Sequence, residues 1–375
     1  MQTFFAYACI NTRHLPDGLA SFFLTSGHIA ISKPAHGIKM TNLQKEKQIV
    51  RDYYQRLDQA ANDAIPAIIG DTVATNYLWR GFHPFNEIRS GETLASTFWQ
   101  PLRDALGSMQ RRMDIFFAGE NRIDGHEGVW VVSMGHLMGL FDKSWLGIPP
   151  TGKIAMLRYA EFNLVKDGQI AETAMYFDIP HLMMQAGLQP FPPQTGAHLV
   201  QPGPMTHDGL LFDAQPAEEG EKTLAAINYM VGDIKTWKGG REEPLVTELR
   251  RSWNEDMIWW GPAGIGATYT IERYAEQHSG PFRAGFKDRI FNGHICRIAE
   301  GHYGGFFGWP NLTLTPTGGF MGMPASDKPA DMRVIDIYRR DGDKLTENWI
   351  FIDLLHFWKM QGLDILERMT KVPRT

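Results

Sequence analysis

The sequence predicts an α+β protein of two tandem cone-shaped domains, each a curved, mostly antiparallel sheet with helices on one face. Three observations support this fold class. Motifs of the first half of the chain recur in the second half, a proline-rich stretch separates the two copies, and helical patterns precede strand patterns within each copy. A chain of 375 residues is long for one domain and sufficient for two.

The repeat becomes visible when the chain is shifted by 175 positions. The stretch "GIPPTGK" at 147–153 then falls on "GMPASDK" at 322–328, and "AETAMYFDIPHL" lies opposite "TENWIFIDLLHF". A shift of 180 positions aligns Trp79 with Trp259. A period this long indicates duplicated domains rather than a solenoid of short repeats.

The domain organisation follows from these copies. We expect a first domain at 40–190 and a second at 217–375, joined by a linker at 191–216 in which proline recurs. Residues 1–39 have no basic start and no sustained apolar run, so we interpret them as a disordered leader or a mis-called start. A cleaved targeting segment is the alternative for this stretch.

Each copy is expected to begin with a long amphipathic helix, which in copy one follows an N-cap at Thr41 or Asn42. A strand carrying Trp79 or Trp259 comes next, then a helix near 91–107 or 270–280. Three or four strands and a short helix complete each copy. In copy one, Asp167-Gly168 predicts a type I′ hairpin between the last two strands.

Composition excludes several classes of protein. The apolar fraction of 43% and the charged fraction of 21% are ordinary for a globular chain, and the net charge of −5 gives no reason to expect nucleic acid or a membrane as partner. Two cysteines provide no disulfide framework, so we expect a cytoplasmic protein. Dinucleotide, P-loop, hydrolase-elbow and zinc-protease motifs are missing from the sequence, which predicts no cofactor and no metal site.

The last strand of each copy ends in an aspartate, Asp178 or Asp353. Alternation places each on a mostly apolar strand face, with Tyr176 in copy one and with Trp349 and Phe351 in copy two. If this face lines a cavity, burial raises the pKa of the carboxyl group and suits it to acid–base catalysis near neutral pH. His181 and His356, in the first turn of the helix that follows, are candidate substrate-binding residues. The alternative is that each aspartate only caps this helix, and that the two histidines are packed or partly exposed.

Other side chains could border the same cavities. His136 lies on a strand between two glycines and could polarise a carbonyl or share a proton with Asp178, whereas its counterpart Asn311 could only form hydrogen bonds. His83 stands in a turn near the expected cavity mouth, and Trp79 and Trp259 could form apolar walls. Structural packing would explain these residues equally well.

The pattern "GHLMG" and "GIPPTGK" in copy one, with the Asp-containing closing motif in both copies, resembles the SnoaL-like polyketide cyclases of the nuclear-transport-factor-2-like superfamily. The resemblance covers nearly all of 42–188 and 220–365 and implies a cone-shaped α+β fold. It also implies that Asp178 and Asp353 are general acid–base groups for an intramolecular aldol ring closure, and that Gly135 and His136 line the pocket. Copy two departs from the pattern with Pro310-Asn311, and copy one with Ala174 where copy two has Trp349.

These observations predict a cofactor-independent cyclase or lyase, with an ester cyclase-type activity on a hydrophobic, carbonyl-bearing small molecule. An epoxide or ester hydrolase, with Tyr176 or Glu172 holding a water molecule, and a hydrophobic-ligand-binding module are the alternatives. Domains of this family often pair, so the second copy is expected to make an intramolecular pseudo-dimer with the first, and a homodimer is a further alternative.

Overall fold

The computed structural model describes residues 39–236 and 242–371. The predicted leader, up to residue 38, lies outside the described residues. Two separate sheets account for all the named strands of the described part, and the α+β class expected from the sequence is confirmed. Residues 191–216, all of which are described, contain no helix or named strand; the domain boundaries on either side of them stay a prediction.

The first sheet belongs to the first repeat and has the strand order β2-β1-β6-β5-β4-β3. Only β1 and β6 run parallel; the other neighbours are antiparallel. Its strands are β1 (Val73–Gly81), β2 (Asn86–Ile88), β3 (Leu106–Asn121), β4 (Gly128–Phe141), β5 (Ile154–Lys166) and β6 (Gln169–Phe177). The hairpin between β5 and β6 turns at Asp167 and Gly168, which both have positive φ as a type I′ turn requires.

The second sheet repeats this plan in the second repeat. Its order is β10-β11-β12-β13-β7-β8, with β9 paired to β11 as well, and its only parallel pair, β13 with β7, corresponds to β6 with β1. Its strands are β7 (Trp253–Trp260), β8 (Ala267–Tyr269), β9 (Phe286–Phe291), β10 (Cys296–Glu300), β11 (Tyr303–Pro316), β12 (Ala330–Asp341) and β13 (Lys344–Ile352).

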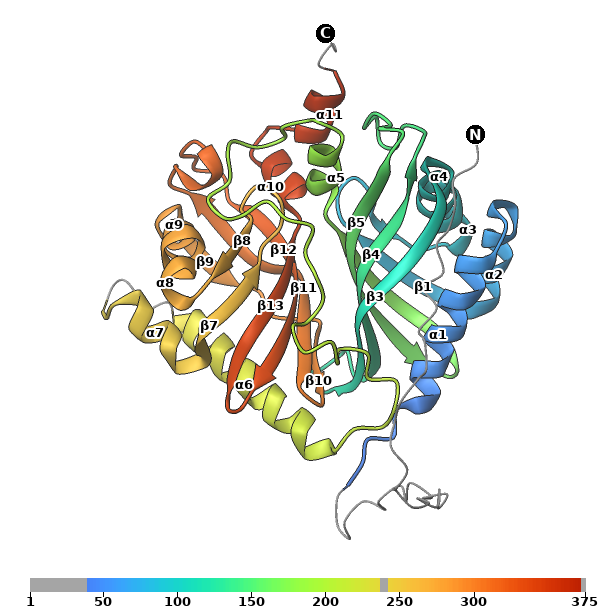
Figure 1. Cartoon of the computed structure of the whole chain (residues 1–375), viewed down its shortest axis with the longest axis horizontal. Coiled ribbons are helices and arrows are strands. Elements are labelled where there is room, and N and C mark those ends of the chain that lie inside the picture. Colours follow the sequence, from blue (N-terminus) through green and yellow to red (C-terminus); the bar gives the residue numbers. More distant parts are fainter. Residues whose placement is uncertain (1–38, 237–241, 372–375) are drawn as a thin grey trace, which may run out of the picture. The chain divides into compact units, whose positions relative to one another are not determined.

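Helices cover one face of each sheet (Figure 1). In the first repeat they are α1 (Gln44–Gln59), η1 (Asn62–Ala64), α2 (Ile65–Thr72), α3 (Gly91–Leu94), η2 (Ala95–Trp99) and α4 (Gln100–Ala105), with α5 (Ile179–Gln185) after the last strand. In the second they are α6 (Ala217–Thr236), α7 (Leu245–Ser252), α8 (Ile271–Tyr274), η3 (Ala275–Ser279), α9 (Gly280–Ala284), η4 (Phe320–Gly322), α10 (Leu354–Met360) and α11 (Ile365–Thr370). A π-helical turn recurs at the same place in both repeats, in η2 and η3.

The opening helix begins later than its sequence suggested. Its N-cap is Leu43, which makes no side-chain capping bond, and the Asn42 alternative is therefore wrong as well. Thr41 is used elsewhere: its hydroxyl donates to Glu300 of the second repeat at 3.0 Å and accepts from the Gln215 amide at 3.0 Å. The Thr41 hydroxyl, which the local sequence pattern predicted to cap the helix, is therefore occupied by long-range hydrogen bonds.

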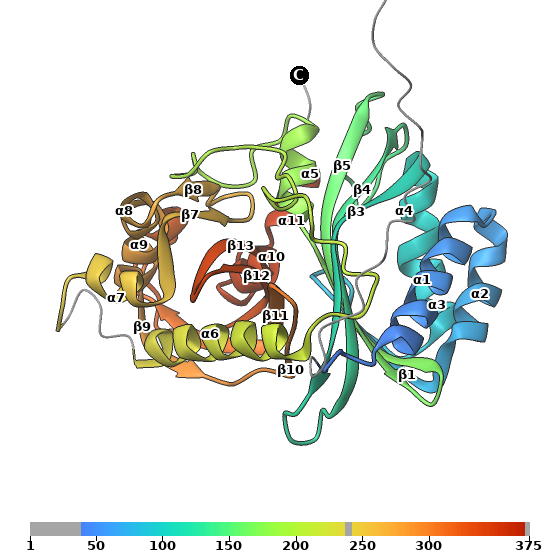
Figure 2. The same cartoon turned by 60° about the horizontal axis from the view of Figure 1, so that its bottom comes forward.

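The two sheets contact each other through the faces that point away from their own helices. Phe307 of β11 packs against Trp130 of β4 and Phe162 of β5, with ring centroids 5.3 and 5.4 Å apart. The guanidinium of Arg158 on β5 lies 4.0 Å from the ring centroid of Phe351 on β13. Figure 2 shows the helices of the first repeat on the outer side of their sheet. Both faces of each sheet are therefore buried, one under helices and one against the other repeat.

Candidate functional site

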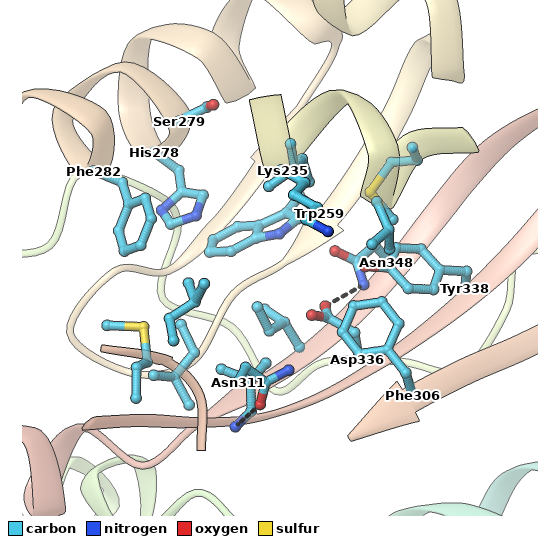
Figure 3. Close-up of a pocket in the computed structure, with 18 of the residues that line it drawn as sticks. Lys235, Trp259, His278, Ser279, Phe282, Phe306, Asn311, Asp336, Tyr338 and Asn348 are labelled. Atoms are coloured by element: carbon cyan, nitrogen blue, oxygen red, sulfur yellow. Dashed lines mark hydrogen bonds between the residues drawn. The ribbon is translucent and has the colours of Figure 1, made fainter. Parts of the chain in front are cut away.

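The second repeat has a cavity of about 140 Å³ between its sheet and its helices, and the exposed Ile234 is part of its lining. Its walls are mainly apolar and aromatic, and they come from the C-terminal end of α6, from η3 and from the inner faces of β7, β11, β12 and β13. Figure 3 shows the polar groups that converge on this space. They include His278, Asn311, Asp336, Tyr338 and Asn348.

Asp336 is the acidic side chain of this cavity. It lies in the middle of β12, on the same strand face as Val334 and Tyr338, and is only 6% exposed. The side-chain amide of Asn348 on β13 donates to its Oδ1 at 3.0 Å. Burial raises the pKa of Asp336 from 3.8 to about 7, and hydrogen bonds from Asn348 and Tyr338 only partly oppose this. A carboxyl group with this pKa can both accept and release a proton at neutral pH.

His278 forms part of the opposite wall. Its ring stacks on Trp259 at a centroid distance of 3.9 Å and an interplanar angle of 17°. Burial lowers its pKa to about 3, so the ring is neutral at physiological pH. Its Nδ1 is buried and has no hydrogen-bond partner among the described residues. This nitrogen can therefore exchange one hydrogen bond with a ligand, in a direction that depends on the tautomer.

The first repeat has a different interior at the corresponding positions. The 175-position shift places Glu161 opposite Asp336, and here Arg111 donates to the carboxylate at 3.2 Å. The Arg111 guanidinium also lies 4.0 Å from the ring centroid of Tyr54 and 5.2 Å from that of Tyr159. Phe98 occupies the position of His278 under the 180-position shift. The guanidinium is ion-paired with Glu161 and, at 3.4 Å, with Asp58, and aromatic rings surround it, so this interior is a packed core.

The strand-end aspartates connect the two repeats. Oδ1 of Asp178 accepts from the His181 amide at 3.0 Å, and its Oδ2 accepts from the Ala263 amide of the other repeat at 2.9 Å. Oδ1 of Asp353 accepts from the His356 amide at 3.2 Å, and its Oδ2 from the His83 amide at 2.9 Å. Each aspartate is thus a helix N-cap that also binds the backbone of the other repeat.

The surroundings of the two aspartates differ in detail. Asp178 borders a cavity of about 10 Å³, room for no more than one water molecule. Burial raises the pKa of Asp353 to about 6, and Arg333, at 3.5 Å from Oδ2, opposes that rise. Both carboxylates already accept two backbone N–H groups, an arrangement that fits capping. The assignment of either as a catalytic base stays a prediction.

The strand face expected to line the cavities is the face that contacts the other repeat. Tyr176 donates to the Gly308 carbonyl of β11 at 3.3 Å, and the Trp349 indole donates to the Pro202 carbonyl at 3.0 Å. Phe351 lies under Arg158 of the first repeat. The expected orientation is therefore wrong. Both faces of these strands are apolar because both are buried, so alternation cannot say which one points to the helices.

The predicted histidines also lie outside the lining of the second-repeat cavity that contains Asp336. His136 lies 3.4 Å from Asp114 through Nδ1, and its Nε2 has no partner among the described residues. The His181 ring contacts Gln185, whose Nε2 lies 3.2 Å from Nδ1. Burial lowers the pKa of His83, and it lowers the pKa of His356 to about 4.

Two of the predicted side chains, Trp259 and Asn311, do line the second-repeat cavity that contains Asp336. The side chain of Asn311 also accepts from the Val334 amide at 2.9 Å, where the β11–β12 ladder is interrupted. Trp79 is packed in the core of the first repeat against Phe98 and Phe177.

Sequence reasoning missed Asp336 and His278. A signal for Asp336 exists, because it is a single carboxylate within the otherwise apolar run "VIDIY" and its repeat counterpart Glu161 is also acidic. Carboxylates are rarely buried without a partner, so such a residue in a core strand is itself informative. His278 has no comparable signal, since helical spacing does not show whether a histidine faces a cavity.

Among the described residues, no group of three or more His, Cys, Asp or Glu side chains is arranged to hold a metal ion. No helix in the described part of the chain is long and apolar enough to cross a membrane.

Comparison with known proteins finds a family similarity for part of the second repeat. Residues 311–359 match the model of the SnoaL-like polyketide cyclase family, which confirms the resemblance found in the sequence. This segment contains Asn311, Asp336, Asn348 and Asp353. No curated protein sequence matches the chain.

Several solved structures are similar over part of the chain. A nuclear-transport-factor-2-like protein from Burkholderia thailandensis E264 is 22% identical, with a TM-score of 0.28, and covers 38% of this chain and 95% of its own. A protein from Jannaschia sp. CCS1, provisionally described as a SnoaL-like polyketide cyclase, is 19% identical, with a TM-score of 0.31, and covers 40% and 94%. A nuclear-transport-factor-2-like protein from Burkholderia xenovorans LB400 is 11% identical, with a TM-score of 0.30, and covers 38% and 96%.

Proposed function

We propose that this protein is an acid–base enzyme of the cyclase or isomerase type, which acts on a hydrophobic, carbonyl-bearing small molecule in the cavity of the second repeat. One observation carries the proposal: the buried side chain of Asp336 faces a mainly apolar cavity, where burial raises the pKa of its carboxyl group to about 7. Perturbed carboxyl groups in such cavities are the usual candidates for catalytic acids and bases.

The chemistry follows from the protonation states. As a carboxylate, Asp336 would remove a proton from the carbon next to a carbonyl and leave an enolate. In a cyclisation, the enolate carbon would attack a second carbonyl group of the same molecule, and the protonated acid would return the proton to the alkoxide formed there. In an isomerisation, it would return the proton to another carbon of the enolate. Asn348, which donates to Oδ1, would orient the carboxylate. The neutral His278 ring would hold the carbonyl oxygen by donating from its unpartnered nitrogen.

The same reasoning favours Asp336 over Asp178 and Asp353 as the acid–base group. Each strand-end aspartate already accepts two backbone N–H bonds, and Asp178 borders a space of about 10 Å³ only. Asp336 accepts no backbone N–H bond among the described residues, is hydrogen-bonded by the side chains of Asn348 and Tyr338, and faces a cavity of about 140 Å³. A volume of this size accommodates about one six-membered ring.

Proton abstraction can be tested without knowledge of the natural substrate. The full-length protein is incubated in D₂O with cyclic ketones from cyclopentanone to 1-tetralone, and loss of the α-proton signal is followed by NMR. We expect at least one ketone to exchange about 10²-fold or more above buffer with the wild type. Asp336→Asn should remove this acceleration, and the matched variant Glu161→Gln in the first repeat should retain it.

The strand-end aspartates provide the opposing outcome. If Asp353→Asn or Asp178→Asn abolished exchange while Asp336→Asn left it intact, the acid–base group would be the capping aspartate and our assignment would be wrong. If every variant bound a ketone without exchange, the protein would be a ligand-binding module.

A further inference from the structure

The second sheet contains a gap beside the cavity. Strand β11 pairs with β10 through Tyr303–Phe307 and with β9 from Leu312 onward, so residues 308–311 are paired with neither of these strands. The ladder between β11 and β12 is interrupted over the same stretch. The loop 292–295 crosses the gap and is held at its two ends, where the Asn292 amide donates to the Asn311 carbonyl at 2.8 Å and the Ile295 amide to the Phe307 carbonyl at 2.9 Å.

His294 lies in the middle of this loop and lines two spaces at once. One is the inner cavity with Asp336, and the other is an outer groove of about 430 Å³ on the other side of the gap. The imidazole is held by a stack on Phe306, with centroids 3.9 Å apart and planes 10° apart. Its Nδ1 is buried and has no hydrogen-bond partner among the described residues. His294 therefore borders both spaces, and no hydrogen bond from this nitrogen to a described residue holds the ring in place.

The backbone next to this ring can accommodate movement. Gly293 has a φ of +99°, a backbone conformation that residues other than glycine rarely adopt. A Cβ atom added to Gly293 would meet no atom within 4 Å. The loop thus has open space at a flexible residue directly before the histidine.

The outer groove has a different chemistry from the cavity. A chain of hydrogen bonds runs along it. The side-chain amide of Asn292 donates to the Thr313 hydroxyl at 2.9 Å, and that hydroxyl donates to the Asp331 carboxylate at 2.8 Å. His126 of the first repeat and Trp309 complete its walls. Carboxylate, amide and hydroxyl groups of this kind bind ligand hydroxyl groups, and no lysine or arginine of the described residues lines the groove to favour an anion.

We propose that the outer groove and the inner cavity form one elongated binding site divided by His294, and that its ligand has a ring-sized apolar end inside and a hydroxyl-bearing end outside. The His294 ring moves aside to admit the apolar end through the gap in the sheet. This inference rests on the proposed function only for the position of the carbonyl group, which would lie at the inner end beside Asp336.

Two fluorinated probes test the site without any assay of catalysis. Fluorobenzene matches the inner cavity, and 3-(4-fluorophenyl)propane-1,2-diol adds a short hydroxyl-bearing tail. Binding to the full-length protein is measured by ¹⁹F NMR, with dissociation rates from line shapes. We expect both probes to bind, the diol about tenfold more tightly because its hydroxyl groups reach the groove. Asp331→Asn and Asn292→Ala should remove this advantage, and Asp327→Asn, exposed outside the groove, should keep it.

The proposed entry route past His294 is tested by changing the size of this side chain. We expect His294→Ala to speed fluorobenzene dissociation about tenfold and His294→Trp to slow it by a similar factor, with each dissociation constant changing less than the rate. Ile234→Trp, in the cavity lining on α6, tests the rival route beside that helix, and Tyr229→Phe, exposed on α6 outside the lining, is the control that should leave the rate unchanged.

The opposite results would overturn the proposal. If Ile234→Trp slowed dissociation while both His294 variants behaved as the wild type, the ligand would enter beside α6. If the diol bound no better than fluorobenzene, or if fluorobenzene did not bind the wild type, there would be no continuous site. None of these readouts depends on proton transfer by Asp336, so failure of the proposed function would be seen separately, in the ketone exchange assay.

Discussion

The interiors of the two repeats start from the same plan and reach opposite results. In the first, Glu161 on β5 is paired with Arg111 on β3, and the guanidinium fills the space between Tyr54, Trp99 and Tyr159. In the second, Asp336 on β12 has a carboxyl group of pKa about 7 and faces a cavity of about 140 Å³. The difference shows how a duplicated domain can keep a buried acid in both copies while, among the described residues, one acid is ion-paired and the other faces a cavity.

The paired acid and the open acid also differ in what they do to stability. A buried carboxylate next to a guanidinium is compensated by its partner, and removing the partner leaves an uncompensated charge in a low dielectric. A buried carboxyl without an ion pair is compensated by taking up a proton instead. The predictions below separate these two solutions.

Loss of Arg111 should have the largest effect. Arg111→Met leaves Glu161 buried without its cation, and we expect the free energy of unfolding to fall by about 3–5 kcal/mol. The double variant Arg111→Met with Glu161→Gln should recover much of that loss. Urea unfolding followed by circular dichroism measures both. Equal losses in the single and double variants would mean that Arg111 contributes packing rather than charge compensation.

Asp336→Asn should raise the free energy of unfolding, where Arg111→Met lowers it, and the size of the increase should depend on pH. The pKa of Asp336 is raised from 3.8 to about 7 in the folded protein, so its protonated form is favoured by folding. Stability from this group is present below pH 4 and is lost as the pH rises through 7. The variant lacks this loss, and we expect it to be roughly 2–4 kcal/mol more stable than the wild type at pH 8 and nearly equal at pH 4. A variant that is less stable at pH 8 would contradict the raised pKa.

His278 should make the protein sensitive to mild acid. Its pKa is lowered from 6.5 to about 3 by burial, so its neutral form is favoured by folding and stability is lost as the pH falls below 6.5. Between pH 7 and pH 5 this amounts to about 2 kcal/mol. We expect His278→Phe, which introduces the residue found at position 98, to lose about that much less than the wild type over this range. His207→Phe, at an exposed histidine, serves as the control.

The strand-end aspartates should give the smallest effects. Asp178→Ala and Asp353→Ala each remove an N-cap and one hydrogen bond to the other repeat, which together should lower the free energy of unfolding by about 1–2 kcal/mol. Ketone exchange at saturating ketone should stay within a few-fold of the wild type in both. A loss of exchange in either variant without a change in stability would favour the catalytic role that the family resemblance implies.

Much of the fold could be predicted because it depends on local patterns. The repeat, the strands with Trp79 and Trp259 and the type I′ turn at Asp167-Gly168 all follow from spacing and turn chemistry that hold wherever the chain goes. The capping geometry of Asp178 and Asp353 is local in the same sense, because an aspartate directly before a helix is within reach of the amide three residues on.

The sequence by itself therefore determined the fold class, the duplication and the capping position of Asp178 and Asp353, but not the N-cap of the opening helix. Only the tertiary structure decided which face of each closing strand meets the helices, because the second sheet buries the other face and makes both equally apolar. It also decided which buried acid faces a cavity. That outcome depends on whether a cation from a distant strand forms an ion pair with the carboxylate. Arg111 does so with Glu161, whereas Asp336 forms no ion pair among the described residues and interacts with Arg158 of the first repeat only at longer range. Such long-range pairing leaves no periodic signal in the sequence.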